Sequence, residues 1–227
     1  MSLKRPLPLD RVFERLYASV GPLHWWPAET PFEVCVGAIL TQNTAWTNVE
    51  KAIINLKQVD IMTPKALCGC PEETLSGLIR PAGYFNVKSR RLKDFVEWLY
   101  LRFDGSLDQM FSGDWHALRA DLLSVRGIGP ETADSILLYA GHKPTFVVDA
   151  YTRRLFHRLG WLAKDAGYDQ TRRLFMDSLP TDVQLFNEYH AQIVEQCKRH
   201  CRTRPLCEGC PLAGDCMYFM GLSLPVC

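Results

Sequence analysis

The chain has 227 residues, of which 47% are hydrophobic, enough for one large domain or two smaller lobes with a substantial core. Its 26 Lys and Arg nearly balance 25 Asp and Glu, so a net charge of +1 neither requires nor excludes a nucleic-acid partner. The start, MSLKRPLPLD, has no apolar leader and no run of eighteen apolar residues occurs, so we predict a soluble cytoplasmic protein with no membrane partner.

Helical spacing of apolar residues dominates the chain. From Asp10 to Val20 it predicts an amphipathic helix that is capped at Asp10 and closed by Gly21 and Pro22. The same spacing predicts further helices at 31–42, 46–57, 87–103, 114–124, 131–141, 149–160, 168–178 and 182–197. Residues 34–40 and 144–148 are apolar enough for strands, but both stretches are short and flanked by helical pattern. We therefore predict an all-α fold.

Two helical lobes are expected from the order of these segments. Residues 31–140 form a continuous block, which we expect to be a central lobe. Residues 1–30 should join residues 141–227 in the second lobe.

The segment 123–133 reads LSVRGIGPETA, a G-I-G turn between two predicted helices. This is the pattern of a helix-hairpin-helix. Gly127 and Gly129 allow a tight turn of bare backbone, so amides at the start of the next helix can face a DNA phosphate. Such a contact binds the DNA backbone and reads no base sequence. An ordinary helix-helix turn also tolerates two glycines, but the continuation TADSILLYA and then VVD favours the DNA-binding motif.

Four of the nine cysteines lie close together near the end of the chain in a C-x5-C-x2-C-x5-C array: Cys201, Cys207, Cys210 and Cys216. Four thiolates at such spacing suit an iron-sulfur cluster or a structural zinc ion. Zinc sites more often have two C-x2-C pairs, so the single pair favours a 4Fe-4S cluster. Charged residues between the cysteines argue against buried thiols or disulfides. The other cysteines are predicted to be reduced thiols: Cys35, Cys68, Cys70, Cys197 and Cys227.

With these motifs in order, the chain resembles the endonuclease III branch of the helix-hairpin-helix DNA glycosylase superfamily. The resemblance covers residues 32–46, the GYFN segment at 83–86, residues 123–154 and the cysteine array 201–216. HWWPAETPFEVCVGAILTQNTAW is similar to the endonuclease III-like 3-methyladenine glycosylases. The first gap of the array has five residues where the family has six, so Cys197 remains an alternative ligand to Cys201.

This resemblance implies a base excision repair enzyme of the bacterial or archaeal cytoplasm that acts as a monomer on double-stranded DNA with a damaged base. Asp149 occupies the position of the family's catalytic aspartate, where a carboxylate stabilises the oxocarbenium-like sugar and orients water. Asp149 can also cap the helix that follows it. The family's lyase lysine is replaced by Glu131, which cannot form an imine, so a monofunctional glycosylase is expected.

The resemblance also implies how the damaged base and the DNA are held. Trp25, Trp26 and Trp46 are candidates for a base pocket, because a cationic alkylated purine gains about 0.5–2 kcal/mol from cation-π contact with indole. Core packing is the alternative for each of them. The implied DNA-contacting residues comprise two gap-filling candidates and the hairpin positions: Gln42, Tyr84, Gly127, Ile128, Gly129 and Thr132. A monovalent cation is implied at the carbonyls of Leu123, Val125 and Ile128.

Two other functions remain open at this point. One is an endonuclease III-type glycosylase and AP lyase on oxidised pyrimidines or mismatches, which the WWP segment mildly disfavours. The other is a non-catalytic iron-sulfur DNA-binding protein, which Glu131 permits. Asp149 discriminates against the latter, because a carboxylate beside phosphates opposes simple binding.

Overall fold

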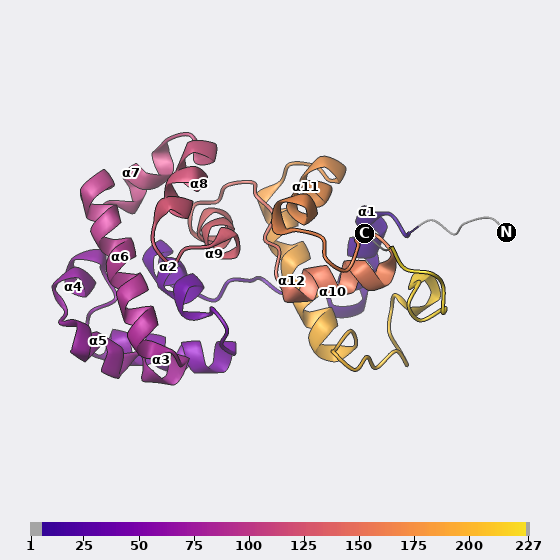
Figure 1. The fold of residues 1–227 in the computed structure, drawn as a ribbon, viewed down its shortest axis with the longest axis horizontal. Coiled ribbons are helices and arrows are strands. Elements are labelled where there is room, and N and C mark those ends of the chain that lie inside the picture. Colours follow the sequence, from indigo (N-terminus) through magenta and orange to yellow (C-terminus); the bar gives the residue numbers. More distant parts are fainter. Residues whose placement is uncertain (1–5, 226–227) are drawn as a thin grey trace. The chain divides into compact units, whose positions relative to one another are not determined.

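The computed structural model describes residues 6–225, so the first residues of MSLKRPLPLD and the expected thiol Cys227 lie outside the described residues. These 220 residues contain helices and no strand, which confirms the all-α prediction (Figure 1). The apolar stretch 34–40 lies within a helix, and 144–148 has no regular secondary structure. The chain divides into two compact units, Trp26–Lys143 and Met1–Trp25 with Pro144–Cys227.

The Trp26–Lys143 unit is built around helix α2 (Pro31–Leu40). Thr30 caps this helix by accepting from the Glu33 amide, and all residues from 32 to 40 are buried. A helix that is apolar on all sides belongs in a core, which explains why this stretch also resembled a strand. Its neighbours in the unit are α3 (Trp46–Gln58), α6 (Phe85–Phe103), α9 (Pro130–Ser135) and the π-helical turn η2 (Ile136–Ala140).

Short helices complete this unit: α4 (Pro64–Gly69), α5 (Glu72–Leu78), the 3-10 turn η1 (Arg80–Ala82), α7 (Leu107–Ser112) and α8 (Trp115–Ser124). The prolines at 64, 71 and 81 predict breaks, and in the structure each stands at a helix start: Pro64 begins α4, Pro71 precedes α5 and Pro81 is the second residue of η1. Proline tolerates this place because the first helical amide needs no partner.

The other unit contains α1 (Leu9–Val20), α10 (Ala150–Leu159), α11 (Tyr168–Ser178), α12 (Val183–Arg199) and the short turn η3 (Ala213–Asp215). Helix α1 begins one residue earlier than expected, and Pro8 is its cap, so Asp10 lies in the first turn and is not the cap. The core is aromatic, with Phe146, Phe156, Phe175, Phe186 and Tyr189 in mutual contact. The Tyr189 hydroxyl donates to the Leu9 carbonyl at 2.7 Å and ties α12 to α1.

Within residues 6–225, no helix combines the length and apolarity needed to cross a bilayer.

Candidate active site and cysteine loop

The predicted hairpin lies between α8 and α9. Gly127 has a φ of +85°, and a Cβ there would overlap the side chain of Arg91 from α6, so both conformation and space require glycine. Gly129 has an ordinary φ of −94° and open space around its Cα; it precedes α9 as a bare N-cap. The Ile128 amide donates to the Val125 carbonyl at 3.1 Å and closes the turn, while the Ile128 side chain is buried.

A buried ion pair joins the two hairpin helices. Arg119 on α8 donates to both carboxylate oxygens of Asp134 on α9, at 2.8 and 2.9 Å, and Asp134 is fully buried. A two-pronged pair of this kind fixes both distance and orientation. The hairpin is therefore held by side chains as well as by its turn.

Both ends of the Gln42 amide group are hydrogen bonded within the protein, the nitrogen to the hairpin and the oxygen to Arg91 of α6. Its Nε2 donates to the Gly127 carbonyl at 3.0 Å and to Thr132 Oγ1 at 2.9 Å, and its Oε1 accepts from Arg91. Thr132 is itself buried. The amide of Gln42 is thus engaged within the protein, although sequence reasoning placed it in the gap left by a flipped nucleotide.

Tyr84 has the opposite environment. It is 72% exposed and has a left-handed backbone (φ +46°), directly before α6. A bulky residue rarely adopts this conformation without a functional reason. Of the two gap-filling candidates, Tyr84 is the one whose ring faces outward.

Glu131 lies exposed in the first turn of α9. Negative charge is favoured at this end of a helix by the helix dipole. Its backbone carbonyl accepts from the Ser135 hydroxyl at 2.7 Å.

Asp149 is the N-cap of α10, as the sequence indicated. Its Oδ1 accepts from the Thr152 amide at 2.7 Å and the Thr152 hydroxyl at 2.9 Å. Its Oδ2 lies 3.5 Å from Nε2 of His190. Burial acts to raise the pKa of Asp149, but the hydrogen bond and charge of His190, together with Thr152, bring that pKa below its ordinary value. The carboxylate is therefore ionised at neutral pH.

His190 is a functional candidate that sequence reasoning missed. It lies on the buried face of α12, and the Trp25 ring stacks on it with centroids 5.5 Å apart and an interplanar angle of 12°. A single histidine on an apolar helical face carries no motif, so no signal in the sequence pointed to it.

The three candidate pocket tryptophans do not share one environment. In the Trp26–Lys143 unit, Trp26 packs edge-to-face on Trp46 at 5.1 Å and tilted on Tyr139 at 5.0 Å. The Trp26 ring also covers Gly37, where a Cβ would approach it to 3.3 Å. Trp25 belongs to the other unit, beside His190 and so in the neighbourhood of Asp149.

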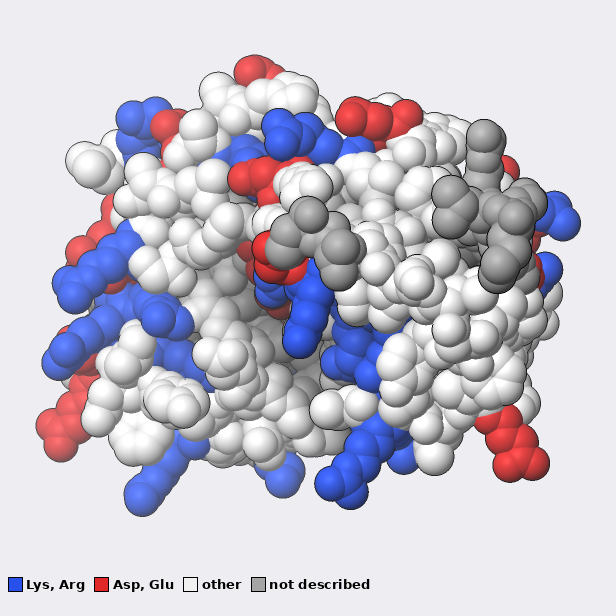
Figure 2. Space-filling view, turned by 45° about the vertical axis from the view of Figure 1, so that its right-hand side comes forward, with Lys and Arg blue, Asp and Glu red and all other residues white. Residues whose placement is uncertain are grey.

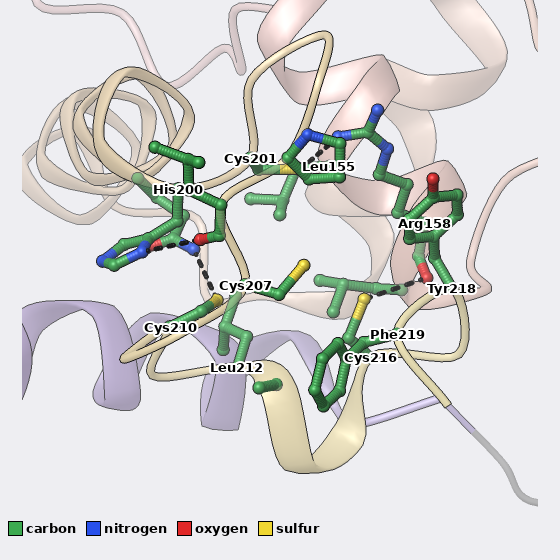
Figure 3. A pocket seen from close by; sticks show the side chains of 15 residues that line it. Leu155, Arg158, His200, Cys201, Cys207, Cys210, Leu212, Cys216, Tyr218 and Phe219 are labelled. Atoms are coloured by element: carbon green, nitrogen blue, oxygen red, sulfur yellow. Dashed lines mark hydrogen bonds between the residues drawn. The ribbon is translucent and has the colours of Figure 1, made fainter. Parts of the chain in front are cut away.

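The four array cysteines line one pocket, together with apolar residues such as Leu155, Leu212 and Phe219 (Figure 3). Two sulfurs accept hydrogen bonds: Cys201 from Arg158 Nη1 at 3.3 Å and Cys210 from Gln196 Nε2 at 3.1 Å. Across the described part of the chain, no three His, Cys, Asp or Glu side chains converge closely enough for a single metal ion. The sulfurs surround a space, and they do not meet at one point.

Arg158 organises this loop. Its guanidinium also donates to the carbonyls of Arg202 at 2.7 Å and Thr203 at 3.0 Å, and it lies 5.0 Å from the ring centre of Tyr218. The neighbouring Arg154 donates to the Cys201 carbonyl at 2.8 Å. Both arginines lie on α10, so the helix that Asp149 caps also carries the cysteine loop.

Cys197 and Cys201 have opposite electrostatic environments. A hydrogen bond from Cys197 and, in smaller part, Arg158 lower the pKa of Cys201 to about 6, against the effect of burial. The same hydrogen bond and burial raise the pKa of Cys197, which lies 3.6 Å from the Tyr151 carbonyl. Cys201 is the better thiolate, and it lines the pocket, whereas Cys197 is not among the lining residues.

Comparison with known proteins decides the family. Residues 36–181 match the model of the HhH-GPD superfamily of base excision DNA repair proteins. The chain belongs to the HhH-GPD superfamily. It is 47% identical over 209 residues to "Putative DNA repair glycosylase MJ1434" of Methanocaldococcus jannaschii, covering 91% of this chain and 94% of that protein.

Two further relatives place this HhH-GPD protein in the endonuclease III-like branch. Endonuclease III of Thermotoga maritima is 30% identical over 190 residues, covering 83% of this chain and 84% of that protein. The structure of the H. pylori 3-methyladenine DNA glycosylase MagIII bound to 1,N6-ethenoadenine aligns with a TM-score of 0.73 and 29% identity, covering 85% of this chain and 98% of that one. The chain is thus a DNA glycosylase of the HhH-GPD family, and its substrate is DNA.

Some basic side chains on α6 of this HhH-GPD protein bind other parts of the protein. Arg90 pairs with Glu72 at 3.0 Å, and Lys93 donates to the Leu67 and Cys68 carbonyls at 2.8 Å. Figure 2 shows Lys and Arg spread over the face in view with Asp and Glu among them, as the near-zero net charge suggests. DNA binding therefore depends on local geometry more than on overall charge.

Proposed function

We propose that the chain is a monofunctional DNA glycosylase that hydrolyses the N-glycosidic bond of an alkylated purine such as 3-methyladenine. Two residues carry the proposal: Asp149, which is ionised, and Glu131, which stands at the position of the family's lyase lysine. Asp149 supplies the carboxylate that hydrolysis needs. Glu131 lacks the amine that strand cleavage needs.

Asp149 acts on the sugar. As the glycosidic bond breaks, positive charge develops on the ring oxygen and C1', and a fixed carboxylate stabilises it without reorganising solvent. Thr152 holds one carboxylate oxygen, so the other, on the His190 side, is the one suited to orient or deprotonate water. An alkylated purine is already cationic and leaves without strong acid catalysis.

Lys88 is the amine whose pKa makes it a candidate to replace the family's lysine. Burial lowers the pKa of Lys88 to about 8, a value that suits a nucleophile, and the charge of Arg91 adds to this effect. However, Lys88 is only 1% exposed and its Nζ is hydrogen bonded to three oxygens inside the Trp26–Lys143 unit. An amine held in this way cannot reach a sugar carbon.

Two observations support the preference for alkylated purines: the indole rings of the tryptophans and the similarity to a 3-methyladenine DNA glycosylase. Trp26 and Trp46 form a half-buried aromatic pair, and Trp25 stacks on His190, which lies 3.5 Å from Asp149. Indole faces attract a cationic base by about 0.5–2 kcal/mol more than a neutral one. The likeness to the H. pylori 3-methyladenine DNA glycosylase supports the same preference. The 30% identity to endonuclease III of T. maritima favours the second candidate, a glycosylase and AP lyase on damaged pyrimidines, and Glu131 argues against its lyase step.

On duplex DNA, we assign gap filling to the exposed Tyr84 and support of the hairpin turn to Gln42 and Thr132. The backbone at Gly127, Ile128 and Gly129 would face phosphates beside the lesion, with a monovalent cation on the carbonyls of Leu123, Val125 and Ile128. The protein would act as a monomer.

We further propose that Cys201, Cys207, Cys210 and Cys216 hold a 4Fe-4S cluster. The residues fit such a group: four sulfurs line one pocket, and two of them accept hydrogen bonds. When bound, the cluster would tie the loop together and supply a redox centre.

A panel of duplexes with single lesions tests the function. Each duplex carries 3-methyladenine, 1,N6-ethenoadenine, thymine glycol or a G·T mismatch, and strand breaks are scored with and without alkali. We expect abasic sites from the alkylated purines that become breaks only after alkali. Release of thymine glycol alone, with breaks before alkali, would establish the second candidate instead.

A further inference from the structure

Lys88 is buried, and its ammonium has no carboxylate partner among the residues that the structure describes. It is 1% exposed, and its Nζ donates to Leu40 O at 2.8 Å, Thr44 Oγ1 at 2.7 Å and Ala82 O at 2.8 Å. Lysine is almost never fully buried unless it is paired, because removing the ammonium from water is costly. An apolar side chain of similar length would fill the same space at lower cost, so core stability alone does not explain this residue.

The three acceptors belong to the two segments that carry Gln42 and Tyr84. Leu40 ends α2 just before the turn that contains Gln42, and Thr44 ends that turn. Ala82 ends η1, two residues before Tyr84. Two of the acceptors are carbonyls at the ends of helical segments, where the helix dipole favours a cation.

Lys88 is also connected to Tyr84 through the backbone. It lies in the first turn of α6, and its amide donates to the Tyr84 carbonyl at 2.9 Å. Tyr84 is left-handed and largely exposed, a strained arrangement that persists only when its surroundings over-determine it. The Thr44 hydroxyl adds a further link by donating to the Ala82 carbonyl.

We propose that Lys88 is a positioning residue: its ammonium locks the Tyr84 loop to the Gln42 turn and so presents the Tyr84 ring ready to enter the gap that a flipped nucleotide leaves. This inference rests on the proposed glycosylase function. Filling the gap matters only in a duplex, because flipping there costs stacking and pairing, whereas a single strand has no gap to fill. Lys88 should therefore affect duplex DNA and leave single-stranded DNA unaffected.

The test compares base release from 3-methyladenine in a duplex and in the same strand alone, under single-turnover conditions at pH 7. Lys88→Met should lower the duplex rate about tenfold, within the coupling range of residues in contact, and change the single-strand rate less than about twofold. In a Tyr84→Ala background, Lys88→Met should lower the duplex rate by less than a further factor of about two, because both residues act through the same step. Equal losses on both substrates, or additive losses in the double variant, would overturn the proposal.

Lys93→Met is the matched control. Lys93 lies on the same helix and also donates to carbonyls, those of Leu67 and Cys68 among them, but these lie in the last turn of α4 and not in the segments that carry Gln42 and Tyr84. Lys93→Met should preserve the ratio of the duplex rate to the single-strand rate. If Lys88→Met does not fold, Thr44→Val removes one acceptor of the Lys88 ammonium. This variant should lower the duplex rate by a smaller factor and again leave the single-strand rate unaffected. An unchanged ratio of the two rates counts against the positioning role of Lys88.

A second readout separates this inference from the proposed function. 2-Aminopurine placed beside the lesion brightens when the duplex is unstacked, whether or not the base is released. Wild-type protein should brighten it, and Lys88→Met and Tyr84→Ala should both reduce the change. If the wild type brightens the probe and releases no base, while Lys88→Met reduces the brightening, the glycosylase function is rejected and the positioning role of Lys88 is retained. An equal fluorescence change in wild type and Lys88→Met would reject the positioning role.

Discussion

Nε2 of His190 lies 3.5 Å from Oδ2 of Asp149, and the two side chains come from the middle of one helix and the cap of another. Thr152 fixes the opposite carboxylate oxygen, so Asp149 is held from both sides. The Trp25 ring covers the imidazole. This arrangement gives the carboxylate a defined orientation and keeps it charged, and it underlies the first two predictions.

Asp149→Asn should lower base release by at least about a hundredfold while DNA affinity is kept or increased, because the amide can still cap α10 but cannot stabilise positive charge on the sugar. Single-turnover kinetics and binding measurements check this. Asp182→Asn, at the exposed cap of α12, is the control and should be silent. A rate near wild type in Asp149→Asn would remove this residue from the mechanism.

The pH dependence follows from the lowered pKa of Asp149. Since the carboxylate is already ionised above its ordinary pKa of 3.8, its protonation should cause no loss of base release between pH 7 and pH 5. Protonation of Asp149 should lower base release only below pH 3.8. The contribution of Asp149 to folding stability is lost in the same range, as the pH falls through its folded-state pKa. A loss between pH 7 and 5 in the wild type that disappears in Asp149→Asn would show that the pKa of Asp149 is raised instead.

Glu131 predicts the absence of strand cleavage. Borohydride should trap no covalent complex between the protein and damaged DNA, because a carboxylate forms no imine. Glu131→Lys should introduce trapping, since the hairpin geometry depends on Gly127 and Gln42 and not on this exposed side chain. Efficient trapping by the unmodified protein would identify another amine as the nucleophile.

The cysteine pocket predicts iron and sulfide in anaerobically purified protein, with broad absorbance near about 400 nm. Cys201→Ser should lose more iron than Cys197→Ser, because Cys201 lines the pocket and has the lowered pKa. One zinc ion per chain without sulfide would contradict the cluster. A larger iron loss in Cys197→Ser would exchange the two ligand assignments.

The two hairpin glycines should respond differently to alanine. Gly127→Ala combines a positive φ with overlap on Arg91, so it should destabilise the protein by at least about 1–2 kcal/mol and weaken DNA binding. Gly129→Ala meets neither obstacle and should fold with near wild-type stability. Urea unfolding and DNA-binding titrations compare the pair, and equal destabilisation would mean that the turn differs from the one described.

Local features could be predicted from the sequence because they depend on neighbours along the chain. Helical spacing identified the longer helices, such as α6 and α12, and the G-I-G pattern and the capping aspartate located the hairpin and α10. Short helices such as α4, α5 and α7 were missed, since six or seven residues show too little periodicity. The resemblance of motifs in order was sufficient to assign the family.

Tertiary packing decided which distant groups meet. The sequence placed Gln42 and Tyr84 together as gap fillers, but only packing against the hairpin shows that the Gln42 amide is bound internally while the Tyr84 ring is exposed. Likewise, no local pattern brings His190 to Asp149 or buries the Lys88 ammonium among three oxygens. Such contacts join residues far apart in the chain, and their energy depends on burial and orientation, which the folded arrangement alone determines.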